Sequence, residues 1–361
     1  MRHLATIREI ASLRPIEGAD RIEVAQVDGW ECVVQKGEFH VGEHIVYIEV
    51  DSIVPERPEF EFLRDRKFRV RTIKLRGQVS QGLVLPLSIL PNGTPAILGA
   101  DVTDALGVKK YDPEAQQEAQ LLTKQPQKPQ SAIARFLMRF KWYRKLFMKP
   151  KRKGEFPDWI AKTDETRVQN LTTLFEMERN KGTKFSVTEK VDGQSATYYL
   201  RKVSKRKYEF GVCSRNIYLG TPDNSSYWTI ARQLHIEDVL KNLIGDYETI
   251  VLQGEICGNQ IQGNKYHISG YDLFAFNLIY PDHKCGTAEI KKLLEPYGIK
   301  TVPIVEEGKT LPETIAELVE YSKGKSVVRK EQKREGVVMR NVQSNISFKV
   351  INPDFLLAEK D

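Results

Sequence analysis

Residues 188–195 read TEKVDGQS and place a lysine, an aspartate and a glycine directly after a strand-like segment. That segment, KFSV (residues 184–187), alternates apolar and polar residues, which is typical of a short strand. A lysine amine attacks an electrophile only when it is unprotonated, and its ordinary pKa is about 10.4. If Lys190 is a nucleophile, nearby cations, burial or a metal ion must lower its pKa.

Five further polar segments end or follow strand-like runs downstream of Lys190. In chain order they are CSRN (213–216), LQGEICG (252–258), YDLFAFN (271–277), REGVVMR (334–340) and SFKVIN (347–352). Together they supply an arginine, two glutamates, a phenylalanine pair and a second lysine. Cations and metal-binding carboxylates are the groups that stabilise charge on a phosphate under attack. The ordered set therefore indicates phosphate chemistry rather than a chance placement of surface charges.

For residues 155–361 we predict a mixed fold of antiparallel sheets with flanking helices, and not a strict alternation of strands and helices. Amphipathic helices are expected around Tyr227–Ile244, Ala288–Leu294 and Pro312–Tyr321. The triplet Gly324-Lys325-Ser326 lacks the upstream glycine of a phosphate-binding P-loop, so that class of nucleotide site is excluded.

The region 1–111 reads as an all-β domain. Its short apolar or alternating segments are separated by turn residues, and they are IEVAQV (22–27), ECVVQ (31–35), HIVYIEV (44–50) and FRVRTIKL (68–75). Short strands without a long helix predict a small barrel of the oligonucleotide/oligosaccharide-binding (OB) type. The whole chain is therefore expected to be α+β, with the OB-like barrel first.

A basic strand is predicted at the end of this barrel. Lys67, Arg69 and Arg71 are expected to share one face of it, where they would follow a phosphate backbone and bind RNA or form a solvated outer surface. The sequence leaves both interpretations open.

Residues 112–154 are expected to form a linker followed by a basic amphipathic helix. The first part is rich in Gln and Pro, and residues 131–153 hold nine Lys or Arg and no acid, more than the formal net charge of +7. Such a helix would bind nucleic acid, an anionic surface, a partner protein or the neighbouring domain, and the sequence does not choose among them.

The composition is that of a soluble protein. It is 40% hydrophobic and 29% charged, and no apolar run approaches the roughly 20 residues of a membrane span. The N-terminus does not resemble a signal peptide, and the four cysteines lie far apart. We expect a cytoplasmic monomer without disulfides, and no membrane partner.

In order and spacing, the polar segments resemble motifs I, Ia, III, IIIa, IV and V of the covalent nucleotidyltransferases, which comprise ATP-dependent ligases and mRNA-capping enzymes. The resemblance implies that Lys190 becomes a lysyl-AMP. It makes Lys349 and Arg215 catalytic cations. It assigns Mg²⁺ or Mn²⁺ to three carboxylates, Asp192, Glu255 and Glu335.

The same resemblance implies a nucleotide pocket. Glu189, directly before the lysine, is similar to the glutamate that contacts the adenine amino group in RNA ligases, which favours ATP. Phe276, or Phe274 on the opposite strand face, would stack on the base. The full nucleotide-binding set is Glu189, Asp192, Gly193, Glu255, Phe276 and Glu335.

Within the superfamily the chain resembles RNA ligases with an N-terminal OB domain, known from Naegleria and Deinococcus. DNA ligases and capping enzymes carry an OB domain after motif V, and only twelve residues follow Lys349 here. The expected function is an ATP-dependent RNA ligase that seals 3′-OH and 5′-phosphate ends in RNA repair. A DNA ligase and an inactive RNA-binding OB protein are the alternatives.

Two features stand beside this resemblance. The segment FPDWIAKTDETRVQN (156–170) also matches such ligases, and Arg167 in it would contact phosphate or RNA, or lie on a solvated helix. Motif V departs from the usual pair of lysines, because Ser347 occupies the first position. The second cation would then come from Lys330, Lys333 or Arg334.

Overall fold

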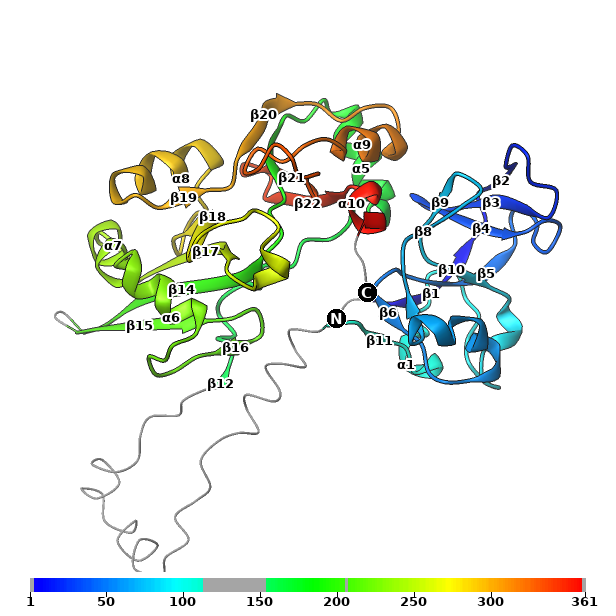
Figure 1. The fold of residues 1–361 in the computed structure, drawn as a ribbon, viewed down its shortest axis with the longest axis horizontal. Coiled ribbons are helices and arrows are strands. Elements are labelled where there is room, and N and C mark those ends of the chain that lie inside the picture. The colour runs from blue at the N-terminus through cyan, green and yellow to red at the C-terminus, as the bar shows by residue number, and fades with distance from the viewer. Residues whose placement is uncertain (1–2, 113–153, 205–206, 359–361) are drawn as a thin grey trace, which may run out of the picture.

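The computed structural model of the protein describes residues 3–112, 154–204 and 207–358. Short strands and a 3-10 helix make up the N-terminal part, and two antiparallel sheets with flanking helices make up the C-terminal part, as the sequence predicts (Figure 1). The predicted linker and basic helix fall almost wholly on residues 113–153, which lie outside the described residues. Among the helices that are described, none is long and apolar enough to cross a membrane.

The N-terminal part is a set of small sheets around two apolar clusters. The strand groups, in hydrogen-bonding order, are β1 (Ala5–Glu9), β5 (His44–Ile48) and β10 (Leu83–Leu85); β2 (Ser12–Pro15), β3 (Ile22–Val27) and β4 (Trp30–Gln35); β11 (Lys109–Lys110), β6 (Ser52–Ile53) and β7 (Arg69–Val70); and β8 (Ile73–Leu75) with β9 (Gln78–Ser80). Alternate residues of these strands, such as Ala25 and Val27 on β3, enter the core. Fully burying one large side chain such as Phe60 stabilises the fold by about 1.5–3 kcal/mol.

The long basic strand predicted for residues 68–75 is wrong. Lys67 and Phe68 both have left-handed backbone angles, with φ of 51° and 58°, so they reverse the chain at the end of the 3-10 helix η1 (Pro58–Arg66). Only β7 and β8 remain as strands, separated by two residues. Lys67, Arg69 and Arg71 therefore do not share the face of one strand.

The C-terminal part is built on two sheets. The larger has the order β12 (Gly154–Glu155), β16 (Ile217–Tyr218), β15 (Lys207–Cys213), β14 (Gln194–Ser204), β17 (Thr249–Gly258), β18 (Tyr271–Ile279) and β19 (Lys300–Thr301). The smaller has the order β20 (Ile304–Lys309), β13 (Phe185–Glu189), β21 (Gly336–Asn341) and β22 (Ile346–Ile351). Strand β13 ends at Glu189 and β14 begins at Gln194, so residues 190–193 cross from the smaller sheet to the larger one.

Helices cover one face of each sheet. Three of them share a core with the larger sheet: α6 (Ser226–Gln233), α7 (Ile236–Leu243) and α8 (Thr287–Leu294). Two others, α5 (Thr172–Asn180) and α9 (Ile315–Ser322), pack Phe175 and Leu318 on the smaller sheet. The single helix expected over Tyr227–Ile244 is two helices, because His235 between them adopts a left-handed conformation with φ of 47°.

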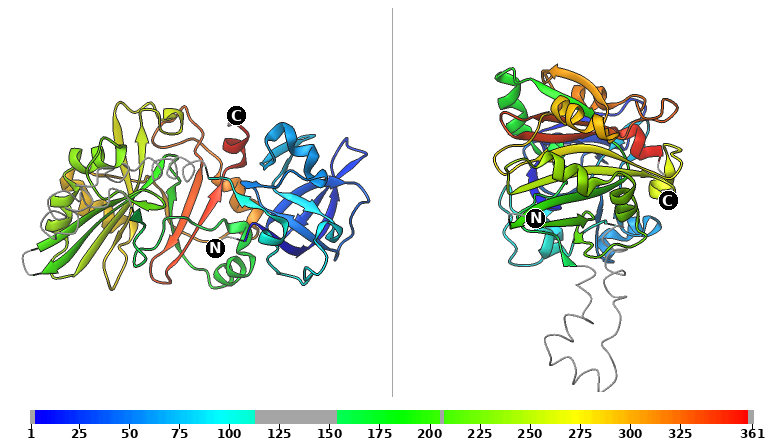
Figure 2. Two further views of the ribbon diagram at one scale, coloured as in Figure 1. Left: turned by 90° about the horizontal axis from the view of Figure 1, so that it is seen from below. Right: turned by 90° about the vertical axis from the view of Figure 1, so that its left-hand side faces the viewer.

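The barrel docks on the short 3-10 helix η3 (Val168–Asn170). Gly29 N donates to Gln169 O at 3.2 Å, and Trp30 Nε1 donates to Asn170 Oδ1 at 2.7 Å. Asn170 in turn donates from Nδ2 to Glu49 Oε1 at 2.6 Å. In the left view of Figure 2 the barrel lies beside the end of the molecule that carries the smaller sheet. Residues just before η3 thus join the barrel to the strand that carries Lys349.

Candidate active site

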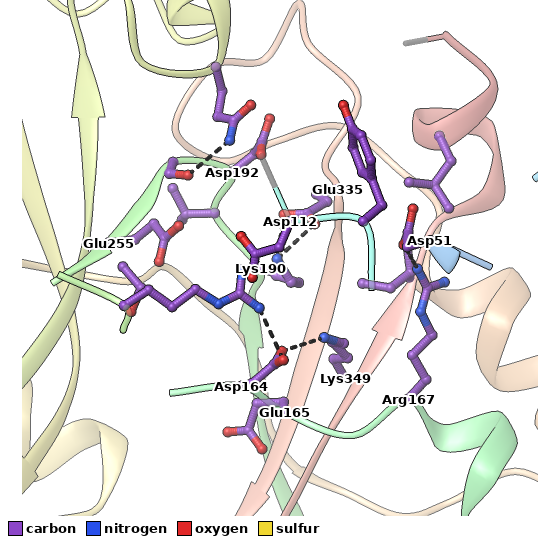
Figure 3. Close-up of a pocket in the computed structure, with 18 of the residues that line it drawn as sticks. Asp51, Asp112, Asp164, Glu165, Arg167, Lys190, Asp192, Glu255, Glu335 and Lys349 are labelled. Atoms are coloured by element: carbon purple, nitrogen blue, oxygen red, sulfur yellow. Dashed lines mark hydrogen bonds and ion pairs between the residues drawn. The ribbon is translucent and has the colours of Figure 1, made fainter. Parts of the chain in front are cut away.

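A cavity of about 1390 Å³ lies where the two sheets and the barrel meet. Its walls include Lys190, the crossing residues after it, and side chains from β17, β18, β21 and β22. The barrel contributes Asp51, Lys67, Arg69, Arg71 and Lys110. Figure 3 shows that charged side chains from these separate elements point into one space. Every residue predicted to act in catalysis or to bind the nucleotide, the metal or RNA lines this cavity, whereas the alternative stacking residue Phe274 and the three candidates for the second cation of motif V do not.

Lys190 lies at the centre of the cavity, immediately after β13. Its backbone N–H donates to Gly336 O at 3.0 Å, which fixes the start of the crossing segment. Its Nζ lies 2.7 Å from both carboxylate oxygens of Glu335. Burial lowers the pKa of Lys190, but the charges of Glu335 and Glu255 outweigh that effect, so its pKa lies above the ordinary value. In this state the lysine is an ammonium ion, and neutralising the carboxylates around it would lower its pKa.

Three carboxylates surround the lysine. Asp192 Oδ2 accepts from Lys265 Nζ at 2.6 Å, and the Asp192 N–H donates to Tyr266 Oη at 2.9 Å. Burial, and then the charge of Glu335, raise the pKa of Asp192 to about 6. Carboxylates that oppose one another's ionisation in this way form a site suited to a divalent cation with oxygen ligands. Asp192, Glu255 and Glu335 thus offer the oxygen ligands that Mg²⁺ or Mn²⁺ prefers, although their carboxylate oxygens do not all lie within 4.8 Å of one another.

Gly193 is held where no side chain fits. A Cβ there would lie 2.4 Å from Ile256 O and 2.8 Å from Cys257 Sγ. The glycine thus lets the crossing segment pass against the end of β17, beside Glu255. Of the predicted nucleotide-binding residues, it is the one whose requirement is steric.

Glu189 is buried beside the lysine, with 1% of the residue exposed. Its Oε2 accepts from Val327 N at 2.7 Å, whereas its Oε1 is buried and has no hydrogen-bond partner among the described residues. Burial raises the pKa of this carboxyl group. An acceptor buried without a partner costs about 1–3 kcal/mol, which a ligand amino group would offset.

The two phenylalanines of β18 differ in burial, although both contact the same apolar cluster. Phe274 is buried in an apolar cluster with Val191 and Cys257, whereas Phe276 lines the cavity. The Arg340 guanidinium lies 5.7 Å from the centre of the Phe276 ring. This geometry makes Phe276 the available stacking surface and leaves Phe274 in the core.

The cations predicted for phosphate binding converge on Asp164. Lys349 Nζ lies 3.0 Å from Asp164 Oδ1, and Arg215 Nη2 lies 3.0 Å from its Oδ2. Burial lowers the pKa of Lys349 to about 8, although Asp164 acts in the opposite direction. Lys349 itself is anchored by its N–H, which donates to Thr166 O at 2.8 Å.

The second cation of motif V does not come from Lys330, Lys333 or Arg334. Arg334 donates to the carbonyl oxygens of Tyr321, Ser322 and Lys323, and none of the three is among the described residues that line the cavity. Arg340, directly opposite Ser347 in the pairing of β21 with β22, does line it. Ser347 Oγ donates to Glu165 Oε2 at 2.7 Å, and Glu165 Oε1 lies 3.7 Å from Arg340 Nη2.

The four residues predicted to bind RNA lie at the barrel side of the cavity. Lys67 is exposed and Arg71 partly so. Arg69 and Arg167 each lie 2.9 Å from Asp51, and only 5% of Arg167 is exposed. Arg167 therefore helps to hold the barrel on η3, and it is not on a solvated helix.

Sequence reasoning missed several polar residues of this cavity, among them Lys110, Asp164, Lys265 and Arg340, as well as Tyr266, which contacts Asp192 behind it. Tyr266 and Lys265 follow motif III closely, and Arg340 ends motif IV, so a search of motif flanks would have found them. Lys110 belongs to the barrel and reaches Asp164 at 3.1 Å only through the docking of the two parts. No local pattern signals such a contact.

Family comparisons assign both parts of the chain. An OB-fold domain model matches residues 4–87, and an RNA ligase model matches residues 183–351. No protein of curated function matches the chain significantly in sequence.

Solved structures of an RNA ligase from Naegleria gruberi match nearly the whole chain. The complex with PPi is 34% identical, covers 99% of this chain and 98% of its own, and has a TM-score of 0.79. A mutant with AMP and Mn is 34% identical, covers 100% of both chains and has a TM-score of 0.80. A mutant with ATP and Mn is 34% identical, covers 98% and 97%, and has a TM-score of 0.78. The chain therefore belongs to the RNA ligase family, in the group that carries an OB-fold domain ahead of the ligase domain.

Proposed function

We propose that this protein is an ATP-dependent RNA ligase that joins a 3′-OH to a 5′-phosphate end through a lysyl-AMP on Lys190. The observation that carries the proposal is the set of residues around Lys190. Glu335 contacts its Nζ, the partly buried carboxylates Asp192, Glu255 and Glu335 line one cavity with it, and Glu189 beside it holds an unpaired acceptor among the described residues. Solved relatives hold AMP or ATP with Mn, which supports ATP and a divalent metal as the cofactors here.

The first step is attack on ATP. Nζ of Lys190 forms a bond to the α-phosphorus, the bond from that phosphorus to the bridging oxygen breaks, and pyrophosphate leaves. Mg²⁺ or Mn²⁺, held by Asp192, Glu255 and Glu335, would supply positive charge to the phosphate and to the carboxylates. Once Glu335 is neutralised it no longer favours the ammonium form, and Lys190 loses its proton at lower cost.

The base is bound by complementary groups. Glu189 Oε1 would accept from the exocyclic amino group of adenine, whereas guanine presents a carbonyl oxygen there and would be repelled. Phe276 would stack on the ring. Gly193, Asp192 and Glu255 would border the ribose and the α-phosphate.

The remaining steps transfer AMP to RNA. The 5′-phosphate of the RNA attacks the lysyl-AMP, Lys190 regains its amine, and the 3′-OH then displaces AMP to form the phosphodiester. Lys349 and Arg215 would neutralise the phosphates, while Lys67, Arg69, Arg71 and Arg167 at the barrel side would contact RNA. We infer that the protein acts as a monomer and that it seals nicks during RNA repair.

We propose a separate role for each domain. Residues 1–111 form the OB-like nucleic-acid-binding domain, 112–154 the linker, and 155–361 the nucleotidyltransferase domain. The two alternatives, a DNA ligase and an inactive RNA-binding protein, gain no support from the matched family or from the intact set of charged residues.

Intact mass after incubation with ATP and Mg²⁺ tests the proposal. Wild-type protein is expected to gain one AMP, and Lys190→Ala to gain none. Lys184→Ala, which removes an exposed lysine just before β13, is the matched control and is expected to gain AMP normally. An adduct on Lys190→Ala, or no adduct on the folded wild-type protein with any nucleotide, contradicts the proposal.

A further inference from the structure

Asp164 is the meeting point of cations from three separate parts of the chain. Lys349 on β22 reaches its Oδ1 at 3.0 Å. Arg215, which follows β15, reaches its Oδ2 at 3.0 Å, and Lys110 on barrel strand β11 reaches the same oxygen at 3.1 Å. Figure 3 shows Asp164 with a dashed line to Lys349. One carboxylate thus partners three cations.

The charges do not balance within this group. Burial raises the pKa of Asp164, but the three cations outweigh it and hold its pKa well below the usual range. At Lys349 the balance is reversed. Burial lowers the pKa of its ammonium group to about 8, although the charge of Asp164 acts to raise it. Asp112 also lies 3.7 Å from Lys110, so the three cations face two carboxylates; one net positive charge remains, which attracts an anion of higher charge than a carboxylate.

The group also lies open to a ligand. Asp164, Lys110, Arg215 and Lys349 all line the cavity that holds Lys190, and 36% of the Asp164 side chain is exposed. Pyrophosphate, the leaving group of the proposed first step, carries several negative charges and phosphate oxygens that accept from arginine and lysine. It would contact the same cations with more charge than the aspartate brings.

We propose that Asp164 is an internal competitor for the polyphosphate: it occupies the anion position between Lys110, Arg215 and Lys349, and it lowers their affinity for pyrophosphate. The proposal rests on the proposed function and extends it to product release. When ATP binds, the cations turn from Asp164 to the phosphates. When pyrophosphate leaves, Asp164 takes the cations back, so that the leaving group is not held in place. No bond is made or broken in this exchange.

An alternative role makes the opposite prediction. If Asp164 only positioned the three cations for phosphate, its removal would let them separate and would weaken pyrophosphate binding. If it competes, its removal strengthens binding. The sign of the change therefore distinguishes a competitor from a positioning residue.

Calorimetric titration of the full-length protein with pyrophosphate measures this sign without requiring catalysis. It is done at about pH 6.5, so that Lys349 stays charged. For Asp164→Asn we expect the Kd for pyrophosphate to fall about fivefold or more, because a charge that competes for all three cations is lost. Asp164→Glu, which keeps the charge, should stay closer to wild type than Asp164→Asn does. Asp158→Asn, an exposed change in the same segment, should bind like wild type.

A second variant, Asp164→Ala, repeats the test if the asparagine variant is unstable, and thermal unfolding of each variant shows that it is folded. Unchanged or weaker binding of pyrophosphate by the folded, uncharged variant overturns the proposal. Failure of the proposed function is seen separately, as absence of the AMP adduct in the wild-type protein.

Discussion

Glu189 is the side chain that we propose distinguishes ATP from GTP. Strand β13 carries it into the core, where the N–H of Val327 orients one carboxylate oxygen at 2.7 Å. The other oxygen is buried with no partner among the described residues, and burial raises the pKa of the group. A donor from the ligand therefore relieves a cost that the free protein bears, whereas a carbonyl oxygen adds to that cost.

The variant Glu189→Ala tests this selection. We expect the KM for ATP in formation of the enzyme–AMP adduct to rise about tenfold, because one hydrogen bond to a charged group contributes about 1.5–3 kcal/mol. The preference for ATP over GTP should fall with it, as measured by adduct formation from each nucleotide. Glu331→Ala, in the loop that faces Glu189, is the control and should retain both values. An unchanged ratio of ATP to GTP use in Glu189→Ala would show that the base is read elsewhere.

At the scale of elements, strand β18 divides two aromatic residues between stability and binding. Phe274 is buried in an apolar cluster with Val191 and Cys257, whereas Phe276 packs at the edge of the same cluster and lines the cavity. Residues two apart on a regular strand share a face, and the pairing of β18 with β17 shifts between Ala275 and Asn277, next to Phe276.

Paired substitutions separate these roles. Phe276→Ala should raise the KM for ATP by about tenfold, since stacking of a base on an aromatic ring contributes about 1–3 kcal/mol, and should change the melting temperature little. Phe274→Ala should lower the free energy of unfolding by about 3–5 kcal/mol, because it leaves a cavity in the core. Adduct formation at varied ATP and thermal unfolding of both variants provide the measurements. A higher KM for ATP in Phe274→Ala, together with a loss of stability in Phe276→Ala, would mean that the two rings have been assigned the wrong roles.

Elements were predictable where local pattern determines them. Residues 22–27 form the strand β3 that their alternation indicates, and residues 249–258 form β17. The expected basic strand failed because Lys67 and Phe68 turn the chain through left-handed conformations without a glycine to signal it. His235 ends a predicted helix in the same way. Such conformations are imposed by packing, which a sequence pattern does not reveal.

The site was predictable to the same extent. Lys190, its neighbours and the carboxylates lie at strand ends that the sequence marks, and the structure brings them into one cavity. Asp164 and Lys110 could not be found, because their contact joins residues 54 positions apart across the junction of the two parts. The roles of all these residues remain predictions.

At the scale of the molecule, the position of the barrel determines which cations reach the site. Gly29 packs directly on the backbone of η3, and Arg167 joins Asp51 of the barrel to the segment that anchors Lys349. Lys110 reaches Asp164 only in this arrangement. Docking of the barrel therefore completes the group of cations around Asp164.

The variant Gly29→Ala perturbs this docking. Its Cβ would lie 2.7 Å from Gln169 Cα and 3.0 Å from Gln169 O, so the barrel must shift. We expect the free energy of unfolding to fall by about 1–3 kcal/mol from overpacking, and RNA joining to fall more than the stability loss explains. Gly154→Ala, whose nearest neighbour lies at 3.9 Å, is the matched control and should behave like wild type. Chemical denaturation and end-joining rates give the two quantities, and a variant that is destabilised yet joins RNA normally would contradict the coupling.

The most direct test of the central claim is the sealing of a single nick in a duplex by the full-length protein with ATP and Mg²⁺. The strand that ends at the nick carries a 3′-OH and is made of RNA in one substrate and of DNA in the other. We predict that the RNA end is joined to the 5′-phosphate, that the DNA end is joined more slowly, and that Lys190→Ala joins neither. Joining of the DNA end in preference to the RNA end, or joining of RNA by Lys190→Ala, would contradict the account.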